Sequence, residues 1–324
     1  MNKSNMNSIQ GEGERAALPA VVRIEPASSC NLKCSHCPTG LGHAPKGIMK
    51  MTIFNKVLED LIQYGQLVST VVLYHGGEPL LNKNLGQMIV EVKKTEVGKV
   101  KIVSNGKNLD TGWANILINS GLDELEISLD SVGPNESDLV RRKSDSKMIL
   151  HNIRNLLHLK SLSNSNLVVR IASTQFVDDY GISSISDLVD PPIPRWLSSA
   201  ESGLEVKSTW SIQWPGGLPD SQAVVFSENL ENIPETCSLL EETVTVRADG
   251  SVVVCCYDLT SKSHMGNVND DSLSAIWLST RYKNFRNGFA QGEYETPCDS
   301  CSVVIGRSFI GRNQITKVGI SSKN

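Results

Sequence analysis

The sequence lacks the features that would assign it to a membrane, to the cell exterior or to nucleic acid. No apolar run approaches the roughly 18 residues that a membrane-spanning helix needs, and no signal-peptide core follows Met1. The formal net charge of −4 offers neither a basic surface for nucleic acid nor a polybasic membrane patch. These absences predict a cytoplasmic protein that binds neither nucleic acid nor membranes. Its 40% hydrophobic and 20% charged residues are typical of a globular enzyme.

Cysteine is absent from a long central part of the chain. Three cysteines lie within residues 30–37, none within residues 38–236, and five within residues 237–301. A disulfide framework would be spread along the chain, and without a secretion signal the thiols are predicted to be reduced ligands. The cysteines therefore predict two separate metal or cluster sites.

The first group lacks a fourth ligand. It reads Cys30-Asn-Leu-Lys-Cys34-Ser-His-Cys37 and follows the apolar run Val21–Ile24. Zinc and iron–sulfur sites are normally closed by four ligands, so three cysteines leave one iron of a [4Fe–4S] cluster open to another molecule. This CxxxCxxC spacing resembles the hallmark of the radical S-adenosylmethionine (radical SAM) superfamily. A zinc knuckle is the alternative interpretation.

Short β-branched runs alternate with longer amphipathic ones from residue 20 to about 215, which predicts βα units and a parallel sheet. The predicted strands are Val21–Ile24, Thr70–Tyr74, Lys99–Val103, Glu124–Leu129, Leu167–Ala172 and Glu205–Ile212. The predicted helices are Ile53–Tyr64, Leu85–Lys94, Gly112–Ile118 and Lys147–Leu159, with Thr52 and Ser146 as N-caps of the first and last. Five or six βα units are too few for a closed eight-stranded barrel.

The predicted fold class is α/β. The resemblance implies a partial (β/α)6 TIM-like barrel, with reacting groups at the C-terminal ends of the strands, followed by a small β-hairpin plus helix domain that binds a cluster. The expected organisation is a disordered N-terminal tail over 1–18, the barrel over 19–220, the auxiliary domain over 221–310 and a C-terminal tail over 311–324.

Polar residues at other strand ends complete the implied SAM site. His75-Gly76-Gly77-Glu78 resembles the GGE motif, which implies that Gly76, Gly77 and Glu78 meet the amino group of SAM. Glycines there let the backbone approach a ligand closely, although an ordinary strand–helix turn is the alternative. The polar turn after the third strand adds Asn105.

Four more residues are implied to contact SAM. Ser128 and Asp130 share one strand face and are implied to point toward the ribose and carboxylate of SAM or toward the substrate. Arg141 could pair with the SAM carboxylate, or lie on a solvated helix face. His36 stands where the family usually has an aromatic residue, so its ring is expected beside the adenine.

The second group of thiols surrounds a predicted hairpin. Cys237 precedes the strand runs joined by Ala-Asp-Gly, Cys255 ends them, and Cys298 and Cys301 follow a predicted helix over Ser272–Arg286. Four thiols predict a closed zinc or iron–sulfur site, and the residues alone do not decide between them. This region resembles the SPASM domain in its truncated "twitch" form, which implies one auxiliary [4Fe–4S] cluster. Cys256 is left over, as a buried thiol, a hydrogen-atom donor or a ligand in place of Cys255.

These resemblances imply an enzyme that cleaves SAM to a 5′-deoxyadenosyl radical and removes hydrogen from a substrate carbon. The first expectation is dehydrogenation of a sugar, aminocyclitol or similar hydroxylated metabolite. Epimerisation of a sugar or peptide through Cys256, maturation of a ribosomally made peptide, and a non-enzymatic iron–sulfur or zinc scaffold are the alternatives. The expected partners are a small-molecule or peptide substrate and a flavodoxin- or ferredoxin-type electron donor.

Overall fold

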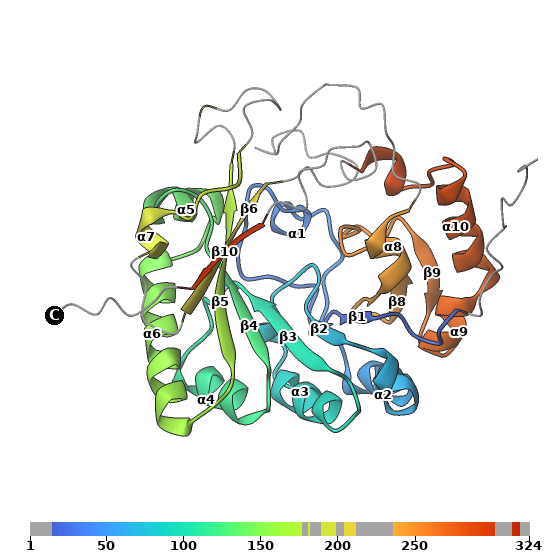
Figure 1. The fold of residues 1–324 in the computed structure, drawn as a ribbon, viewed down its shortest axis with the longest axis horizontal. Helices are drawn as coiled ribbons and strands as arrows, with labels where there is room; N and C mark the ends of the chain where they lie inside the picture. Colours follow the sequence, from blue (N-terminus) through green and yellow to red (C-terminus); the bar gives the residue numbers. More distant parts are fainter. Residues whose placement is uncertain are drawn as a thin grey trace, which may run out of the picture.

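A computed structural model describes residues 15–176, 181, 189–198, 204–211 and 236–301, together with the backbone of 313–317. Its strands form one sheet in the order β10-β6-β5-β4-β3-β2-β1-β7-β8-β9 (Figure 1). The strands are β1 (Val21–Ile24), β2 (Thr70–Leu73), β3 (Lys99–Ser104), β4 (Glu124–Ser128), β5 (Val168–Gln175), β6 (Leu204–Trp210), β7 (Thr243–Val246), β8 (Ser251–Val253), β9 (His264–Asn267) and β10 (Asn313–Lys317). Neighbours from β1 to β6 are parallel. The parallel α/β fold is therefore confirmed.

Helices follow most of the parallel strands and cover the outer face of the curved sheet (Figure 1). They are α1 (Pro38–Leu41), α2 (Met51–Tyr64), α3 (Leu85–Lys93), α4 (Thr111–Asn119), α5 (Pro134–Val140), α6 (Ser146–Ser163), α7 (Arg195–Ser198), α8 (Ser238–Glu242), α9 (Leu273–Leu278) and α10 (Thr280–Ala290). Among the helices of the described residues, none is both long and apolar enough to span a bilayer.

Three details of the predicted helices are wrong. Helix α2 begins earlier than expected, with Lys50 rather than Thr52 at its N-cap. Asp145 rather than Ser146 caps α6, because its carboxylate accepts a hydrogen bond from the backbone N–H of Met148. The helix predicted over Ser272–Arg286 is interrupted at Ser279, whose hydroxyl caps α10 by accepting from the N–H of Tyr282.

The two faces of the parallel sheet differ in chemistry because side chains alternate along a strand. Toward the helices point apolar residues such as Ile102, Ile127 and Ile171, all fully buried. Toward the barrel interior point charged residues that pair across neighbouring strands. Lys101 of β3 contacts Glu124 and Glu126 of β4, and Arg170 of β5 contacts Glu124 and Glu205 of β6. Arg170 therefore faces the interior, a point that the sequence left open.

The C-terminal module continues the barrel sheet instead of forming a detached unit. Strand β7 pairs in parallel with β1, with Val21 beside Thr243, and β8 and β9 follow as an antiparallel extension. Helix α9 is held to α2 by Asp60, whose carboxylate accepts hydrogen bonds from the backbone N–H groups of Leu273 and Ser274. The auxiliary region is thereby fixed relative to the barrel.

Both predicted tails contain ordered segments. At the N-terminal side, Arg15 pairs with Glu241 and Leu18 is 1% exposed, so the expected tail over 1–18 packs on the protein from residue 15. At the other end, residues 313–317 form β10, which pairs antiparallel with β6, within the segment 311–324 that was expected to be a tail. Neither pairing has a local sequence signature, because each partner lies far away along the chain.

Candidate active site

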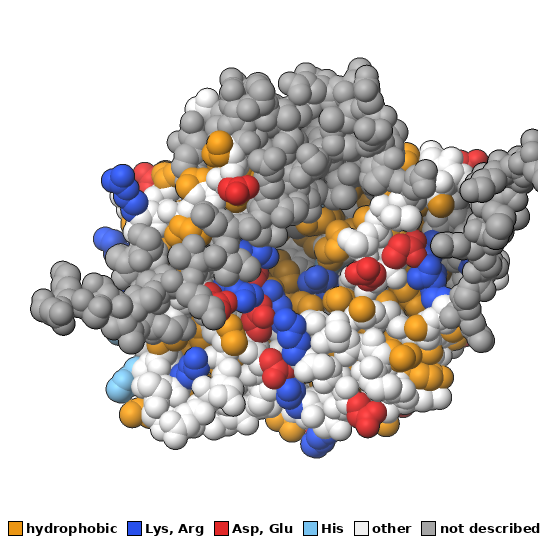
Figure 2. Space-filling model, in the orientation of Figure 1, with side chains coloured by type: hydrophobic (Ala, Val, Ile, Leu, Met, Phe, Trp, Pro, Cys, Tyr) orange, Lys and Arg blue, Asp and Glu red, His pale blue; other side chains and the backbone are white. Residues whose placement is uncertain are grey.

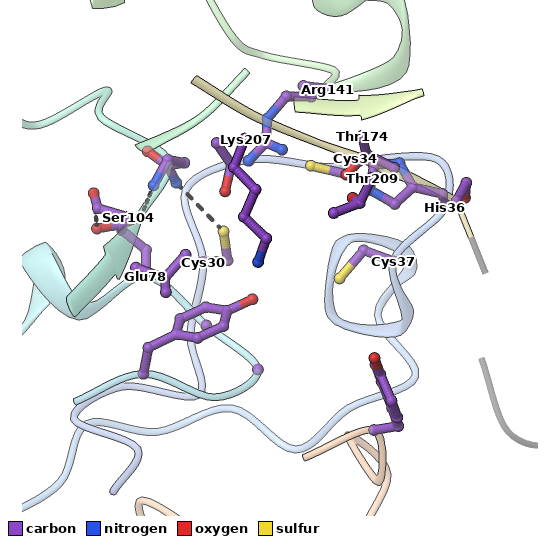
Figure 3. A pocket seen from close by; sticks show the side chains of 18 of the residues that line it. Cys30, Cys34, His36, Cys37, Glu78, Ser104, Arg141, Thr174, Lys207 and Thr209 are labelled. Carbon is purple, nitrogen blue, oxygen red and sulfur yellow. Dashed lines mark hydrogen bonds between the residues drawn. The ribbon is translucent and has the colours of Figure 1, made fainter. Parts of the chain in front are cut away.

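A cavity of about 380 Å³ opens at the C-terminal ends of the parallel strands (Figure 3). This is the edge at which reacting groups gather in parallel barrels. The cavity brings together most of the residues predicted for SAM and its cluster. They are Cys30, Cys34, His36, Cys37, Gly76, Gly77, Glu78, Asn105, Ser128 and Arg141.

The three cysteines of the first motif lie in the loop between β1 and α1, and all line the cavity. Distant backbone holds this loop in place: Lys33 N–H donates to Arg142 O and Ser35 N–H donates to Val140 O, both at 2.9 Å. Gly77 packs against the start of the same loop, where a Cβ would lie 2.2 Å from Ala27 O. Only glycine permits this approach.

The donor chemistry of the loop suits a cationic cluster. Burial raises the pKa of the Cys34 thiol to about 12, with Cys37, Asp130 and Cys30 adding to the rise. Burial likewise raises the pKa of Cys30. A bound metal centre would supply the positive charge that stabilises such crowded thiolates. Within the described residues, no three His, Cys, Asp or Glu side chains are arranged to ligate a single metal ion.

Glu78 lies at the turn after β2 with its carboxylate buried. It accepts hydrogen bonds from Leu80 N–H at 3.0 Å, Ser104 Oγ at 2.8 Å and Asn105 N–H at 2.7 Å. A carboxylate offers about four acceptor positions, so roughly one remains for a ligand. Burial raises the pKa of Glu78 despite these donors. An ammonium group in the cavity would offset that cost.

Asp130 and Arg141 pair with each other. An Arg141 guanidinium nitrogen donates to Asp130 Oδ2 at 2.6 Å, and Thr174 N–H donates to Asp130 Oδ1 at 3.0 Å. Burial alone would raise the pKa of Asp130, but Arg141 and then His36 outweigh it and the pKa falls. Arg141 Nε is buried without a hydrogen-bond partner in the described residues. That donor is available to an anionic group in the cavity, and the alternative of a solvated Arg141 is wrong.

His36 lies between Asp130 and an aromatic ring. Its Nε2 is 3.8 Å from Asp130 Oδ2, and its ring centroid is 5.5 Å from that of Phe176. Burial lowers the pKa of His36, which favours the neutral ring. A neutral imidazole is a flat ring, like the aromatic residue that the family usually has at this position.

The second group of thiols converges beside the barrel. Cys298 and Cys301 are buried in the core, and Cys237 and Cys255 pack against it. Burial raises the pKa of Cys298 to about 12, with Cys301 and Cys237 contributing next. The pKa of Cys255 is also raised, by its hydrogen bond with Cys256, by burial and by Cys301 among others. The charges of Cys237, Cys255, Cys298 and Cys301 thus influence one another.

Cys256 has a different environment from the other four thiols. Its pKa is lowered, first by the hydrogen bond with Cys255 and further by the positive charges of Arg23 and His75. Arg23 lies on β1 and His75 follows β2, so Cys256 is near the barrel while Cys255 is near Cys301.

Several functional candidates were missed by the sequence reasoning. Tyr257 lines the cavity while its backbone N–H donates to Cys255 Sγ at 3.4 Å, so one residue joins the cavity to the second thiol group. The strand residues Thr174, Lys207 and Thr209 also line the cavity. The sequence signal that could have found these three residues is the alternation of side-chain direction along β5 and β6. Trp210 also borders the cavity, whereas Trp214 lies outside the described residues.

Comparison with known proteins identifies two domains. Residues 24–170 match the radical SAM superfamily and residues 237–302 match an iron–sulfur cluster-binding domain, SPASM. The tungsten-containing aldehyde ferredoxin oxidoreductase cofactor-modifying protein of Pyrococcus furiosus is 25% identical over 90% of each chain. A probable GTP 3′,8-cyclase of Methanococcus maripaludis is 28% identical over 35% of this chain. The match spans only 37% of that cyclase.

Solved structures share the fold at lower sequence identity. BtrN in complex with AdoMet and 2-DOIA has a TM-score of 0.57 and 19% identity, covering 89% of this chain and 92% of that one. Native anSMEcpe with bound AdoMet has a TM-score of 0.58 and 15% identity, covering 91% and 90%. The two matched domains imply SAM and [4Fe–4S] clusters as cofactors. The chain therefore carries a radical SAM superfamily domain followed by a C-terminal SPASM domain.

Proposed function

We propose that this enzyme oxidises a hydroxylated small molecule, such as a sugar or an aminocyclitol, by two electrons. When bound, SAM and its reduced cluster supply a 5′-deoxyadenosyl radical that abstracts hydrogen from a substrate carbon. The substrate then loses a proton and a second electron, so that an alcohol becomes a carbonyl. An auxiliary cluster, if held by all four thiols of the second group, would accept that electron, and a flavodoxin or ferredoxin would donate the first.

The residues take the following roles in this proposal. Cys30, Cys34 and Cys37 hold the SAM-binding cluster, and Cys237, Cys255, Cys298 and Cys301 hold one auxiliary cluster. Glu78 receives the SAM ammonium at its remaining acceptor position. Arg141, oriented by Asp130, directs its Nε toward the SAM carboxylate. The SAM site is completed by His36, Gly76, Gly77, Asn105 and Ser128.

The observation that carries the proposal is the position of Tyr257. Its side chain lines the cavity and its backbone N–H donates to Cys255 Sγ. A substrate in the cavity would therefore lie one residue away from the auxiliary thiols. A short path of this kind favours removal of an electron from the substrate radical as the last step. Dehydrogenation ends with that electron removal, whereas epimerisation ends with the return of a hydrogen atom.

The test is anaerobic turnover of reconstituted protein with SAM, a reductant and a panel of sugars, aminocyclitols and peptides. Mass analysis should reveal a product lighter than its substrate by about two mass units, formed with 5′-deoxyadenosine. A product of unchanged mass that carries solvent deuterium would replace the proposal with epimerisation. Absence of 5′-deoxyadenosine with every substrate would contradict both.

Epimerisation is the second candidate because Cys256 lies on the barrel side of the thiol group. A thiol there could return a hydrogen atom to a substrate radical. Under this alternative, Cys256→Ala would still consume SAM but give no product with solvent deuterium. Under dehydrogenation, the same variant would form the oxidised product as the wild type does.

A further inference from the structure

Lys207 is a charged side chain in the cavity to which neither the sequence motifs nor the proposed mechanism gives a role. It lies on β6, it is half-buried, and it lines the cavity. Figure 3 shows its long side chain directed from the strand into the cavity, toward the loop of Cys30. Its ammonium group is therefore available to a bound molecule and not to bulk solvent alone.

The neighbouring charged groups already have partners. Glu78 accepts three hydrogen bonds, Arg141 pairs with Asp130, and Glu205, two residues before Lys207, pairs with Arg170. By contrast, the ammonium of Lys207 forms no ion pair or hydrogen bond in the described part of the chain. A charge that is partly removed from water without a partner is unfavourable, so a ligand that neutralises it gains affinity.

The strand register builds a small polar subsite around this lysine. Ala172 of β5 lies beside Lys207, and Thr174 lies beside Thr209 one step further along the same face. The small side chain of Ala172 leaves room beside Lys207, and both threonines line the cavity together with Lys207. The Lys207 ammonium and the hydroxyl groups of Thr174 and Thr209 thus come from the same wall of the cavity, and such donors suit carboxylate or phosphate oxygens.

We propose that Lys207 binds an anionic group, a carboxylate or a phosphate, on the hydroxylated substrate. The inference rests on the proposed function of the cavity as the substrate site and narrows its substrate class. Arg141 and Glu78 are the groups suited to the charged ends of SAM, which leaves Lys207 for the second molecule. A substrate with an ammonium group at this position would be repelled by Lys207.

Three probes with one ring and different charges test the inference: glucose, glucose 6-phosphate and glucosamine. Their binding to reconstituted, SAM-loaded protein is measured anaerobically by equilibrium dialysis. The wild type should bind glucose 6-phosphate about tenfold or more tightly than glucose, and glucosamine least well. Lys207→Met should reduce the affinity for glucose 6-phosphate to that for glucose, whereas Lys207→Arg should keep the preference.

Lys101→Met is the matched control, because Lys101 also points into the barrel but is paired with Glu124 and Glu126. It should leave the preference for glucose 6-phosphate unchanged. Equal affinity for the three probes in the wild type, or a preference that survives in Lys207→Met, would overturn the inference. The inference would also be overturned if Lys207→Met lost affinity for SAM but kept its affinity for 5′-methylthioadenosine, which lacks the carboxylate. Lys207 would then hold SAM and not the substrate.

The two hypotheses fail in different experiments. The proposed function fails if the wild type forms no 5′-deoxyadenosine, whatever the probes do. The inference about Lys207 fails on the binding of the probes, while 5′-deoxyadenosine formation by the wild type stays intact.

Discussion

The two groups of thiols differ in how much of the chain is needed to build each of them. Cys30, Cys34 and Cys37 lie in one loop of eight residues and line a cavity. Cys237, Cys255, Cys298 and Cys301 come from the start of α8, the end of β8 and the turn after α10, and they pack on the core. The first group borders a space that a ligand can occupy, whereas the second group packs against the hydrophobic core.

This difference indicates how one chain separates two tasks. In the proposed function, the open site with three thiols holds the reacting molecule, and the site with four thiols exchanges electrons. Tyr257 is the residue that touches both, through its side chain on one side and its backbone N–H on the other. If the two sites have separate tasks, a substitution in one should leave the other intact.

The largest effect is expected from Cys34→Ala. Loss of one of only three ligands should abolish the first cluster and reduce 5′-deoxyadenosine formation to background. The second site should survive, so the iron content should fall from about eight to about four atoms per chain. Iron analysis and quantification of 5′-deoxyadenosine check this. Normal SAM cleavage by the variant would remove the distinction between the two sites.

Cys301→Ala should break the second site alone. Iron should again fall to about four atoms per chain, but SAM cleavage should persist and the oxidised product should be lost. Cys256→Ala is the matched control, because Cys256 adjoins the same thiols and is outside the proposed ligand set. It should keep about eight iron atoms. If Cys256→Ala lost iron and Cys255→Ala kept it, then Cys256 and not Cys255 would be the cluster ligand.

Glu78→Gln should weaken SAM binding about tenfold to a hundredfold, because a neutral amide replaces the anion that meets the ammonium group. Burial raises the pKa of Glu78, so wild-type affinity for SAM should rise with pH as that carboxyl ionises. The variant should lack this dependence. Equilibrium binding of SAM across pH provides the measurement, and the exposed Glu96→Gln serves as control. An identical pH profile in Glu78→Gln would refute the role.

Local patterns in the sequence identified most of the predicted residues that line the cavity. The spacing of Cys30, Cys34 and Cys37 is contained in one loop, and local patterns identified the strand that precedes Glu78 and the strand that ends with Ser128. The pairing of Arg141 with Asp130 was beyond such reasoning, because a short stretch does not reveal which buried charges will meet. Lys207 was missed for the same reason: its alternation was visible, but its lack of a partner is a property of the assembled barrel.

Glu25 joins the two regions, and its partners could not be predicted from the sequence. It is 0% exposed at the end of β1, and it accepts hydrogen bonds from the backbone N–H groups of Gly76 and Ala248. Arg247 Nε also donates to it at 3.3 Å. One carboxylate thus ties the glycine turn of the SAM site to the hairpin of the auxiliary region.

Glu25→Gln is expected to change stability and to leave the chemistry of the two sites unchanged. Burial would raise the pKa of Glu25, but His75, Arg247 and Ala248 together lower it from 4.5 to about 2. A lowered pKa stabilises the folded state above pH 4.5, and this contribution disappears as the pH falls toward 2. The shift corresponds to about 3 kcal/mol, which Glu25→Gln should lose at pH 7.

Denaturant unfolding of the wild type and Glu25→Gln, at equal iron content and several pH values, measures this contribution. Any pH-dependent loss of clusters affects both proteins, so their difference isolates Glu25, and it should shrink below pH 4.5. Glu295→Gln breaks only an exposed pair with Arg281 and should cost less than about 1 kcal/mol. A difference between wild type and Glu25→Gln that stays constant down to pH 2 would show that the charge of Glu25 does not hold the two regions together.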